Sequence, residues 1–148
     1  MRHSVTRILA YTPRQLFDLV GDVERYPQFV PWVLRLRTWN RREEGEVVSL
    51  DAEAEVGFSI VHERFATAVR CDAAALAIDV DLISGPFRKL ENRWRFKEHP
   101  RGAELTFSID FEFKSRLLTT LLAANFHHAC NRLIACFEDR ARALYGSS

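Results

Sequence analysis

The sequence predicts an α+β fold in which a curved antiparallel sheet of about seven strands wraps around a long C-terminal helix. Three observations predict this class. Residues 115–145 have the apolar period of an amphipathic helix, whereas residues 33–113 alternate apolar and polar side chains as strands do. One strand and one or two short helices precede the alternating region. The C-terminal helix is long enough to cross the sheet, so we expect it to cover the sheet's apolar face.

The first predicted strand, Ser4–Tyr11, is followed by a helix-start signal. Thr12 can serve as N-cap, Pro13 suits the first helical position, and Gln15 completes a capping box. The helix should end at Gly21 and bury one apolar side, made of Leu16, Phe17, Leu19 and Val20.

Aromatic residues are concentrated in the connector that follows, Tyr26–Trp32. Pro27 and Pro31 forbid a regular helix through this segment, so its rings sit on irregular backbone. The rings can plug the core, or they can form an entrance that packs against a planar ligand. Both interpretations remain open from the sequence.

The alternating region predicts about six strands joined as a meander. Val48–Val56 and Ala103–Phe113 have the clearest alternation, with apolar residues on one face and acidic or hydroxyl residues on the other. Turn residues such as those in Ser84–Pro86 and His99–Gly102 separate the strands. The remaining strands are predicted within Phe58–Cys71, Leu76–Ile83 and Leu90–Phe96.

The C-terminal segment predicts one uninterrupted helix from Ser115 to Tyr145, roughly 45 Å long. Ser115 can cap its start, and Gly146 can close its end. Asn125 at the margin of the inner side and Arg140 near its centre should each need a polar partner. The predicted inner side consists of Leu118, Leu122, Phe126, Ala129, Leu133, Cys136, Phe137 and Leu144.

Length and charge bound the class of protein. The chain has 148 residues, 47% hydrophobic and 28% charged, which suits one domain over residues 1–148. Its 21 Lys and Arg residues nearly balance 20 Asp and Glu residues, so the net charge of +1 gives no overall attraction to nucleic acid or anionic membrane. Binding to either would need a local patch.

The lack of a recognisable targeting signal and the arrangement of the cysteines favour a soluble, cytoplasmic protein. The apolar run near the N-terminus is too short for a signal peptide, and no run approaches the ~18 apolar residues of a membrane span. Cys71, Cys130 and Cys136 cannot all pair, and the last two lie about 9 Å apart along one predicted helix, beyond disulfide reach. We therefore expect a reducing compartment.

The sequence contains no strong catalytic or metal-binding motif. GxSxG, Walker A, GxGxxG and HExxH are absent, and adjacent His127 and His128 would diverge by about 100° on a helix. We expect neither a metal site nor an acid, base and nucleophile set. The densest basic positions are interrupted by acids and predict a solvated surface, with anionic lipid headgroups or ribosomal RNA as alternatives: Arg41, Arg42, Arg88, Lys89, Arg93, Arg95 and Lys97.

Two stretches, Tyr26–Trp32 (YPQFVPW) and Gly85–Phe96 (GPFRKLENRWRF), carry a family resemblance. With the strand order, they resemble the coenzyme Q-binding branch of the START-like, polyketide cyclase-like superfamily, over nearly the whole chain. The resemblance implies the helix-grip fold, a hydrophobic tunnel, and non-enzymatic binding of ubiquinone or a similar isoprenoid lipid for respiration. Val33 stands where family members often have cysteine, so no thiol chemistry is implied there.

The same branch includes bacterial ribosome-association toxins that interfere with joining of ribosomal subunits. The two stretches do not separate that role from lipid carriage, and relatives that are cyclases leave an enzyme as a further alternative. The partners that the resemblance implies are therefore ubiquinone or a similar hydrophobic molecule, peripheral contact with the inner membrane, or a ribosomal subunit. We expect no DNA partner, and no cofactor apart from ubiquinone as bound ligand.

The residues predicted to line the tunnel are mostly aromatic or aliphatic. Gly85 and Pro86 should form a tight turn that holds Phe87, either at the rim where it gates a ligand or as an ordinary core anchor. The partner of Asn125 would be a quinone carbonyl or a backbone group. The predicted lining comprises Tyr26, Phe29, Val30, Trp32, Phe87, Leu90, Trp94, Phe107, Leu122, Asn125, Phe126 and Leu133.

Overall fold

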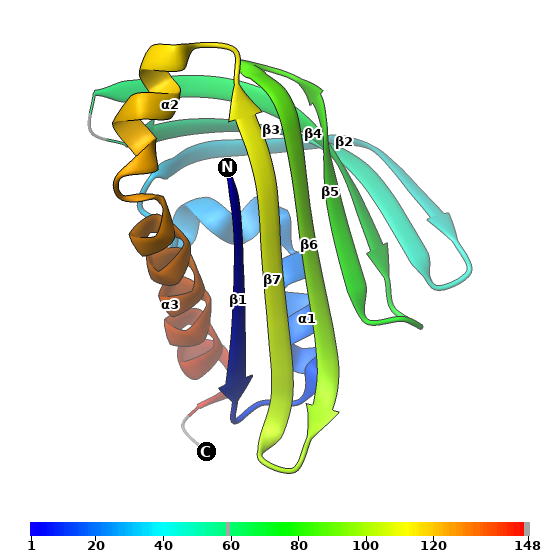
Figure 1. Ribbon diagram of the computed structural model, residues 1–148. Helices are drawn as coiled ribbons and strands as arrows, with labels where there is room; N and C mark the ends of the chain where they lie inside the picture. Colours follow the sequence, from blue (N-terminus) through cyan, green and yellow to red (C-terminus); the bar gives the residue numbers. More distant parts are fainter. Residues whose placement is uncertain (59, 147–148) are drawn as a thin grey trace.

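A single seven-stranded antiparallel sheet curls around the C-terminal helices (Figure 1). The computed structural model describes residues 1–58 and 60–146. The predicted fold class is confirmed, including the short helices after the first strand. The strands are β1 (Arg2–Leu9), β2 (Val33–Glu44), β3 (Val47–Phe58), β4 (Val61–Asp72), β5 (Ala77–Ser84), β6 (Phe87–His99) and β7 (Gly102–Phe113).

Strands β2 to β7 form the predicted meander, and β1 pairs with β7 at the edge, giving the order β1-β7-β6-β5-β4-β3-β2. The pairing shifts register within β2, within β4 beside β5, and at the start of β6. Such bulges add local twist and bend the strands that carry them. They help the sheet curve enough to enclose a helix.

The first helix, α1 (Pro13–Gly21), has the predicted capping box and end. The Gln15 backbone N–H donates to Thr12 Oγ1 at 3.1 Å, and the Thr12 N–H donates to Gln15 Oε1 at 3.0 Å. A 3₁₀ helix, η1 (Val23–Gln28), occupies most of the aromatic connector. At its two ends the Arg25 N–H donates to the Asp22 carbonyl and the Phe29 N–H to the Tyr26 carbonyl, each at 3.1 Å. Pro27 lies inside this short helix and has no N–H to donate.

The prediction of a single long C-terminal helix is wrong in one respect. The helical segment is interrupted at Ala124 and Asn125. Helix α2 (Arg116–Ala123) precedes the interruption, and α3 (Phe126–Tyr145) follows it. Asn125 has φ −121° and ψ 12°, outside the helical region, and Asn is favoured at such N-cap positions. The hydroxyls of Thr119 and Thr120 also bond back to carbonyls four residues earlier, which tends to bend helices.

The buried side of α3 also differs from the predicted inner side. The residues that face the core are Cys130, Ile134, Phe137 and Ala141, whereas Leu144 is 52% exposed. The interruption changes the rotation of α3 relative to α2. Residues Leu133 to Phe137 are all apolar, so a helical wheel of this stretch does not indicate which side of α3 faces the core. Arg140 is half-buried and has the polar partner that the sequence predicted, because its guanidinium donates to Gln28 Oε1 at 3.2 Å. The guanidinium also lies over the Phe29 ring.

Apolar residues inside the curl form two clusters. The main cluster joins α1, α3 and the sheet around Leu16, Trp94, Phe107, Ile134 and Phe137. The second cluster consists of buried Leu90, Phe111 and Phe113, with half-buried residues from α2 and β4–β6 packed against it. No residue of α2 is itself fully buried. Helix α3 therefore anchors the fold, and α2 covers the inner face more loosely.

Among the described residues, no helix combines the length and apolar character that crossing a bilayer requires. The three cysteines are free thiols, and Cys71 and Cys130 are buried. The sequence had excluded a disulfide between Cys130 and Cys136. Burial raises the pKa of the Cys71 thiol to about 11.

Candidate ligand-binding site

The inner face of the sheet is mostly buried at one end, where Val48 and Leu50 also line a groove beside α1, and is more accessible at the other. At the end of the sheet next to α1, inward residues such as Leu50, Val69, Ile78 and Leu105 are buried. Toward the α2 end, inward residues on the same strands keep part of their surface accessible. This region, called here the open half, comprises Leu36, Ala54, Val56, Val80, Leu82 and Ile109. Figure 1 shows α2 and the α2–α3 interruption at this end of the sheet.

The Gly85–Pro86 turn places Phe87 in a group of rings at the edge of the open half. The Phe87 ring stacks on Phe113 with centroids 4.8 Å apart and meets Phe65 edge-on at 5.2 Å. Gly85 has φ +145°, and a Cβ there would lie 2.6 Å from Phe65 Cβ. Glycine is thus required both for the turn and for the close approach of β4. The half-buried Phe87 lies within the second cluster.

The aromatic connector divides into core anchors and one residue nearer the open half. Tyr26 and Phe29 each pack edge-on against Phe137 at 5.2 Å, and Val30 is fully buried. The Tyr26 hydroxyl donates to the Val20 carbonyl, and burial raises the pKa of Tyr26 far above its ordinary value. Tyr26 and Phe29 therefore pack against the main cluster, whereas Val30 is buried without belonging to either cluster.

Trp32 behaves differently from the rest of the connector. It is half-buried, packs edge-on against Phe58 of β3 at 6.3 Å, and carries the Arg132 guanidinium 5.3 Å from its ring centre. The Trp32 carbonyl also accepts the Gly57 N–H at 2.9 Å, which ties the connector to the end of β3. Unlike Tyr26 and Phe29, Trp32 packs against neither core cluster.

The predicted lining residues on the strands lie deep in the fold. Trp94 and Phe107 are 3% and 1% exposed and meet edge-on at 4.8 Å in the main cluster. Leu90 belongs to the second cluster. These residues form the floor beside the open half and are largely covered by the protein itself.

The predicted lining residues on the helices are separated by the interruption. Leu122 and Phe126 pack against the second cluster, Phe126 also touches the main one, and Leu133 packs against the main cluster alone. Asn125 is exposed, so the expectation that its side chain points toward the sheet is wrong. The break in the helix removes it from the inner side, and its backbone carbonyl accepts the Ala129 N–H at 3.0 Å.

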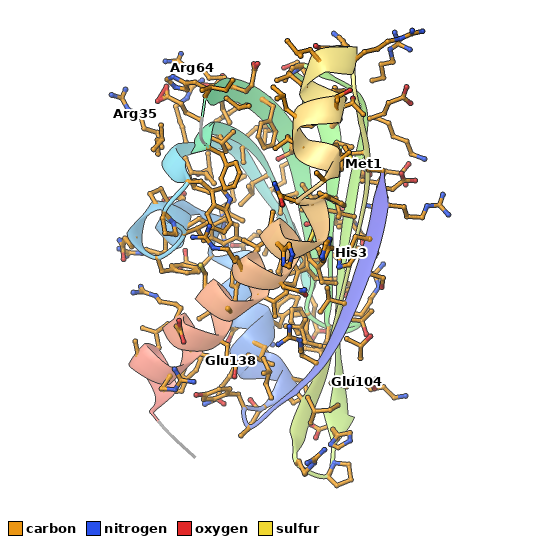
Figure 2. All side chains as sticks on the ribbon, turned by 60° about the vertical axis from the view of Figure 1, so that its left-hand side comes forward. Met1, His3, Arg35, Arg64, Glu104 and Glu138 are labelled. Atoms are coloured by element: carbon orange, nitrogen blue, oxygen red, sulfur yellow. The ribbon has the colours of Figure 1, made fainter. Side chains whose placement is uncertain are left out.

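Besides the inward threonines Thr38 and Thr67, two inward polar residues were not predicted as site residues. Asn92 of β6 donates from Nδ2 to the Ser108 carbonyl at 2.8 Å and accepts the Trp94 indole N–H on Oδ1 at 2.7 Å. His3 of β1 faces α3, where its ring meets Phe126 edge-on at 6.0 Å (Figure 2). Its Nε2 is the one buried side-chain nitrogen or oxygen without a hydrogen-bond partner among the described residues.

The sequence held a signal for one of these residues and none for the other. Asn92 alternates with Leu90, Trp94 and Phe96 along an otherwise apolar face, so strand periodicity alone could have placed it inside. The role of His3 depends on the pairing of β1 with β7, two segments about a hundred residues apart in the chain. Local patterns do not report such a contact.

A separate groove, of about 530 Å³, lies between α1 and the β2–β3 hairpin. It is lined by charged residues such as Arg14, Asp22 and Arg41 together with Cys71. None of the predicted lining residues borders it. Its mixed charges suit a hydrophobic lipid less well than the open half does.

The basic residues of the outer face are largely paired with acids on neighbouring strands. Arg93 bonds Asp81 at 2.8 Å, Arg95 bonds Asp79 at 2.8 Å, and Lys89 bonds Asp110 at 2.7 Å. The Lys89 hydrogen bond holds the pKa of Asp110 below its usual range. This face is a lattice of exposed ion pairs, consistent with the solvated surface predicted from the sequence.

Comparison with known proteins agrees with the fold. The family model described as polyketide cyclase / dehydrase and lipid transport matches residues 9–138. The ribosome association toxin RatA of Rickettsia prowazekii is 37% identical over 137 residues, which cover 93% of each chain. The mitochondrial coenzyme Q-binding protein COQ10 homolog B of Xenopus laevis is 30% identical, over 99% of this chain and 60% of that one.

Solved structures give the same result. An 18 kDa protein from Caulobacter crescentus superposes with a TM-score of 0.85 at 54% identity and covers 99% of both chains. A START superfamily protein from Mycobacterium smegmatis superposes with a TM-score of 0.79 at 25% identity, over 97% of this chain and 98% of that one. The resemblance seen in the two sequence stretches is confirmed. The chain belongs to the polyketide cyclase / dehydrase and lipid transport family, within the START-like superfamily.

Proposed function

We propose that this protein binds ubiquinone or a similar isoprenoid quinone in the open half, without chemical turnover, and carries or presents it to respiratory enzymes. The observation that carries the proposal is the partly accessible apolar inner face, with two inward polar residues, His3 and Asn92, beside it. A quinone has the matching composition, because an apolar tail is joined to a ring with two carbonyl acceptors. The family description and the coenzyme Q-binding relative support the same class of ligand.

The apolar part of the ligand can supply most of the binding free energy. Each buried CH₂ contributes about 0.8 kcal/mol, so two isoprene units of ten carbons contribute about 8 kcal/mol before ordering costs. That magnitude suits micromolar binding. A longer tail would extend beyond the open half.

Exposed apolar residues at the same end of the sheet support a peripheral contact with a membrane. Figure 2 shows Arg35 and Arg64 projecting outward at this end, where they could meet anionic headgroups. Both pair with the same carboxylate, Glu55, so one of their two positive charges stays unbalanced. The exposed apolar residues are Leu34, Ile60, Ile83, Leu117 and Leu121, from the β2 start, the β3–β4 turn, the β5 end and α2.

Purified protein is expected to bind a ubiquinone with two isoprene units with a dissociation constant in the micromolar range, because the open half offers it apolar contacts and hydrogen-bond donors. Fluorescence titration checks this, since Trp32 and Trp94 lie at or near the site. Native extraction followed by mass spectrometry should also recover a quinone. A chain that is isolated ligand-free and does not respond to quinone would contradict the proposal.

A second candidate function is association with ribosomal subunits. Its support is the similarity to two ribosome association toxins, 37% and 34% identical over at least 93% of this chain. The outer face gives it less support, because cations already paired with carboxylates have less charge to offer to RNA phosphates. The two candidate functions place the partner on different surfaces.

Sedimentation of ribosomes with added protein separates the two candidates. At each salt concentration, a quinone carrier should leave the proportion of joined subunits equal to that of ribosomes without added protein, since its ligand lies inside the fold. A protein that binds the subunits should reduce that proportion, and its effect should weaken steeply with salt if phosphate contacts carry it. The second result would favour the ribosomal role.

A further inference from the structure

We infer that His3 and Asn92 form a two-point clamp for the para carbonyls of a quinone ring that lies across Ile109. This inference rests on the proposed function and specifies the ligand's head group. It assigns the tail to the open half and the ring to a defined row of the sheet. The row consists of three inward residues on three neighbouring strands.

The strand register places these residues in line. Ile109 of β7 pairs directly with His3 of β1 on one side and with Asn92 of β6 on the other. His3 and Asn92 are therefore two strand spacings apart, about 10 Å at the backbone. Ile109 lies between them as an apolar support, half-buried at the edge of the open half.

A quinone is about as wide as this row is at the backbone, while the distance between the two donors is set by the side chains, with Asn92 Nδ2 leaning toward β7. The two para carbonyl oxygens of the quinone lie roughly 5 Å apart, since each C=O extends about 1.2 Å from the ring. With a hydrogen bond of about 2.9 Å at each end, the donors would be separated by roughly 11 Å. In the proposed pose a flat ring over Ile109 accepts one hydrogen bond from each flanking side chain.

Both side chains have a donor to offer. The Asn92 amide is oriented by the bond from the Trp94 indole, and Nδ2 uses one hydrogen on the Ser108 carbonyl, which leaves its second hydrogen for a ligand. His3 Nε2 is buried without a partner, a condition that costs stability in the free protein and is relieved when a carbonyl arrives. In its Nε2–H tautomer the imidazole can donate to that carbonyl.

Phe126 adds a conformational step to this binding. Its ring packs edge-on against His3 and lies 4.7 Å from Phe111, so it occupies space next to the row. Phe126 is the first residue of α3, directly after the interruption, whereas the buried residues of α3 begin at Cys130. A shift at the α2–α3 junction can therefore move this ring aside while the rest of α3 stays packed.

The His3→Phe substitution tests the clamp, with two ligands compared: the two-isoprene ubiquinone and an isoprenoid alcohol with the same tail. The quinone should bind about tenfold more weakly, because one hydrogen bond is lost, whereas the alcohol should bind as before. His3→Gln keeps a donor and should recover most of the affinity. The exposed neighbour Ser4→Ala is the control and should change neither ligand.

Two further readouts distinguish a clamp from a structural role. Infrared spectra should show a lowered quinone C=O frequency in the wild type and the loss of one lowered band in His3→Phe. The ligand-free variant should have a Tm about 2–4 °C higher, because the unpartnered nitrogen is gone. A lower Tm together with equal loss of both ligands would show that His3 only packs, and would overturn the clamp.

The outcomes for the clamp and for the proposed function can be separated. If the wild type binds the quinone and His3→Phe binds it equally well with unchanged carbonyl bands, the clamp is wrong and quinone binding stands. If the wild type binds the alcohol and the quinone equally, the open half accepts tails without recognising the ring, which also overturns the clamp. If the wild type binds neither ligand, the proposed function fails and the clamp with it.

Discussion

Replacing Phe137 with alanine is expected to lower the free energy of unfolding by about 3–5 kcal/mol. Phe137 is 1% exposed, and its ring meets Tyr26, Phe29 and Trp94 at 5.1–5.2 Å. Removing it leaves a cavity where η1, α3 and the sheet meet, and rigid rings around it cannot collapse fully. Urea unfolding followed by circular dichroism measures the loss.

Leu144→Ala is the matched control for this prediction. Leu144 is also on α3 and belongs to the inner side predicted from the helical wheel, but it is 52% exposed in the structure. Its loss should cost well under 1 kcal/mol. Equal destabilisation by the two substitutions would contradict the orientation of α3 and restore the inner side predicted from the sequence.

The contrast between these residues shows where helix prediction from the sequence failed. The apolar period from Ser115 to Tyr145 correctly indicates helix, and Ser115 caps it as predicted, with the Leu118 N–H donating to its hydroxyl at 3.3 Å. The interruption at Asn125 depends on a single residue leaving helical geometry. Apolar periodicity does not report the dihedral angles of one residue, so the phase of α3 could not be carried across the break.

The sheet was better predicted, because strand periodicity and turn residues are local signals. Val48–Val56 and Ala103–Phe113 lie within β3 and β7, with their apolar residues on the inner face as expected.

The candidate site was predicted less completely. Its aromatic residues were noticeable as a concentration of rings, but their division into core anchors and accessible residues is decided by packing between distant elements. The local amino-acid composition therefore does not predict which rings are buried and which stay accessible.

The incomplete cover over the sheet is the feature that links the fold to the proposed function. A continuous helix would extend its buried side along the whole inner face, whereas the interruption leaves α2 without a fully buried residue. The apolar residues next to it, such as Val80 and Ile109, are then only half-buried. Partly covered apolar surface costs free energy in the free protein, and a hydrophobic ligand that covers it regains that free energy.

Val80→Trp is therefore expected to weaken quinone binding by at least 100-fold while the protein stays folded. Val80 is half-buried on the inner face and pairs with Asn92, so a larger ring there would occupy space beside the proposed head group. Displacing about four CH₂ groups of the ligand from apolar contact corresponds to about 3 kcal/mol, or a little over 100-fold in the dissociation constant. Isothermal titration with the two-isoprene quinone measures it.

Asp81→Trp supplies the matched control, because it places the same side chain one residue along β5, on the outer face. Asp81 is exposed, and its ion pair with Arg93 at 2.8 Å should contribute less than about 1 kcal/mol to stability. Quinone affinity should be unchanged in this variant. If Val80→Trp bound the quinone as tightly as Asp81→Trp, with both variants folded by circular dichroism, the ligand could not lie in the open half, and the groove beside α1 would become the site to test.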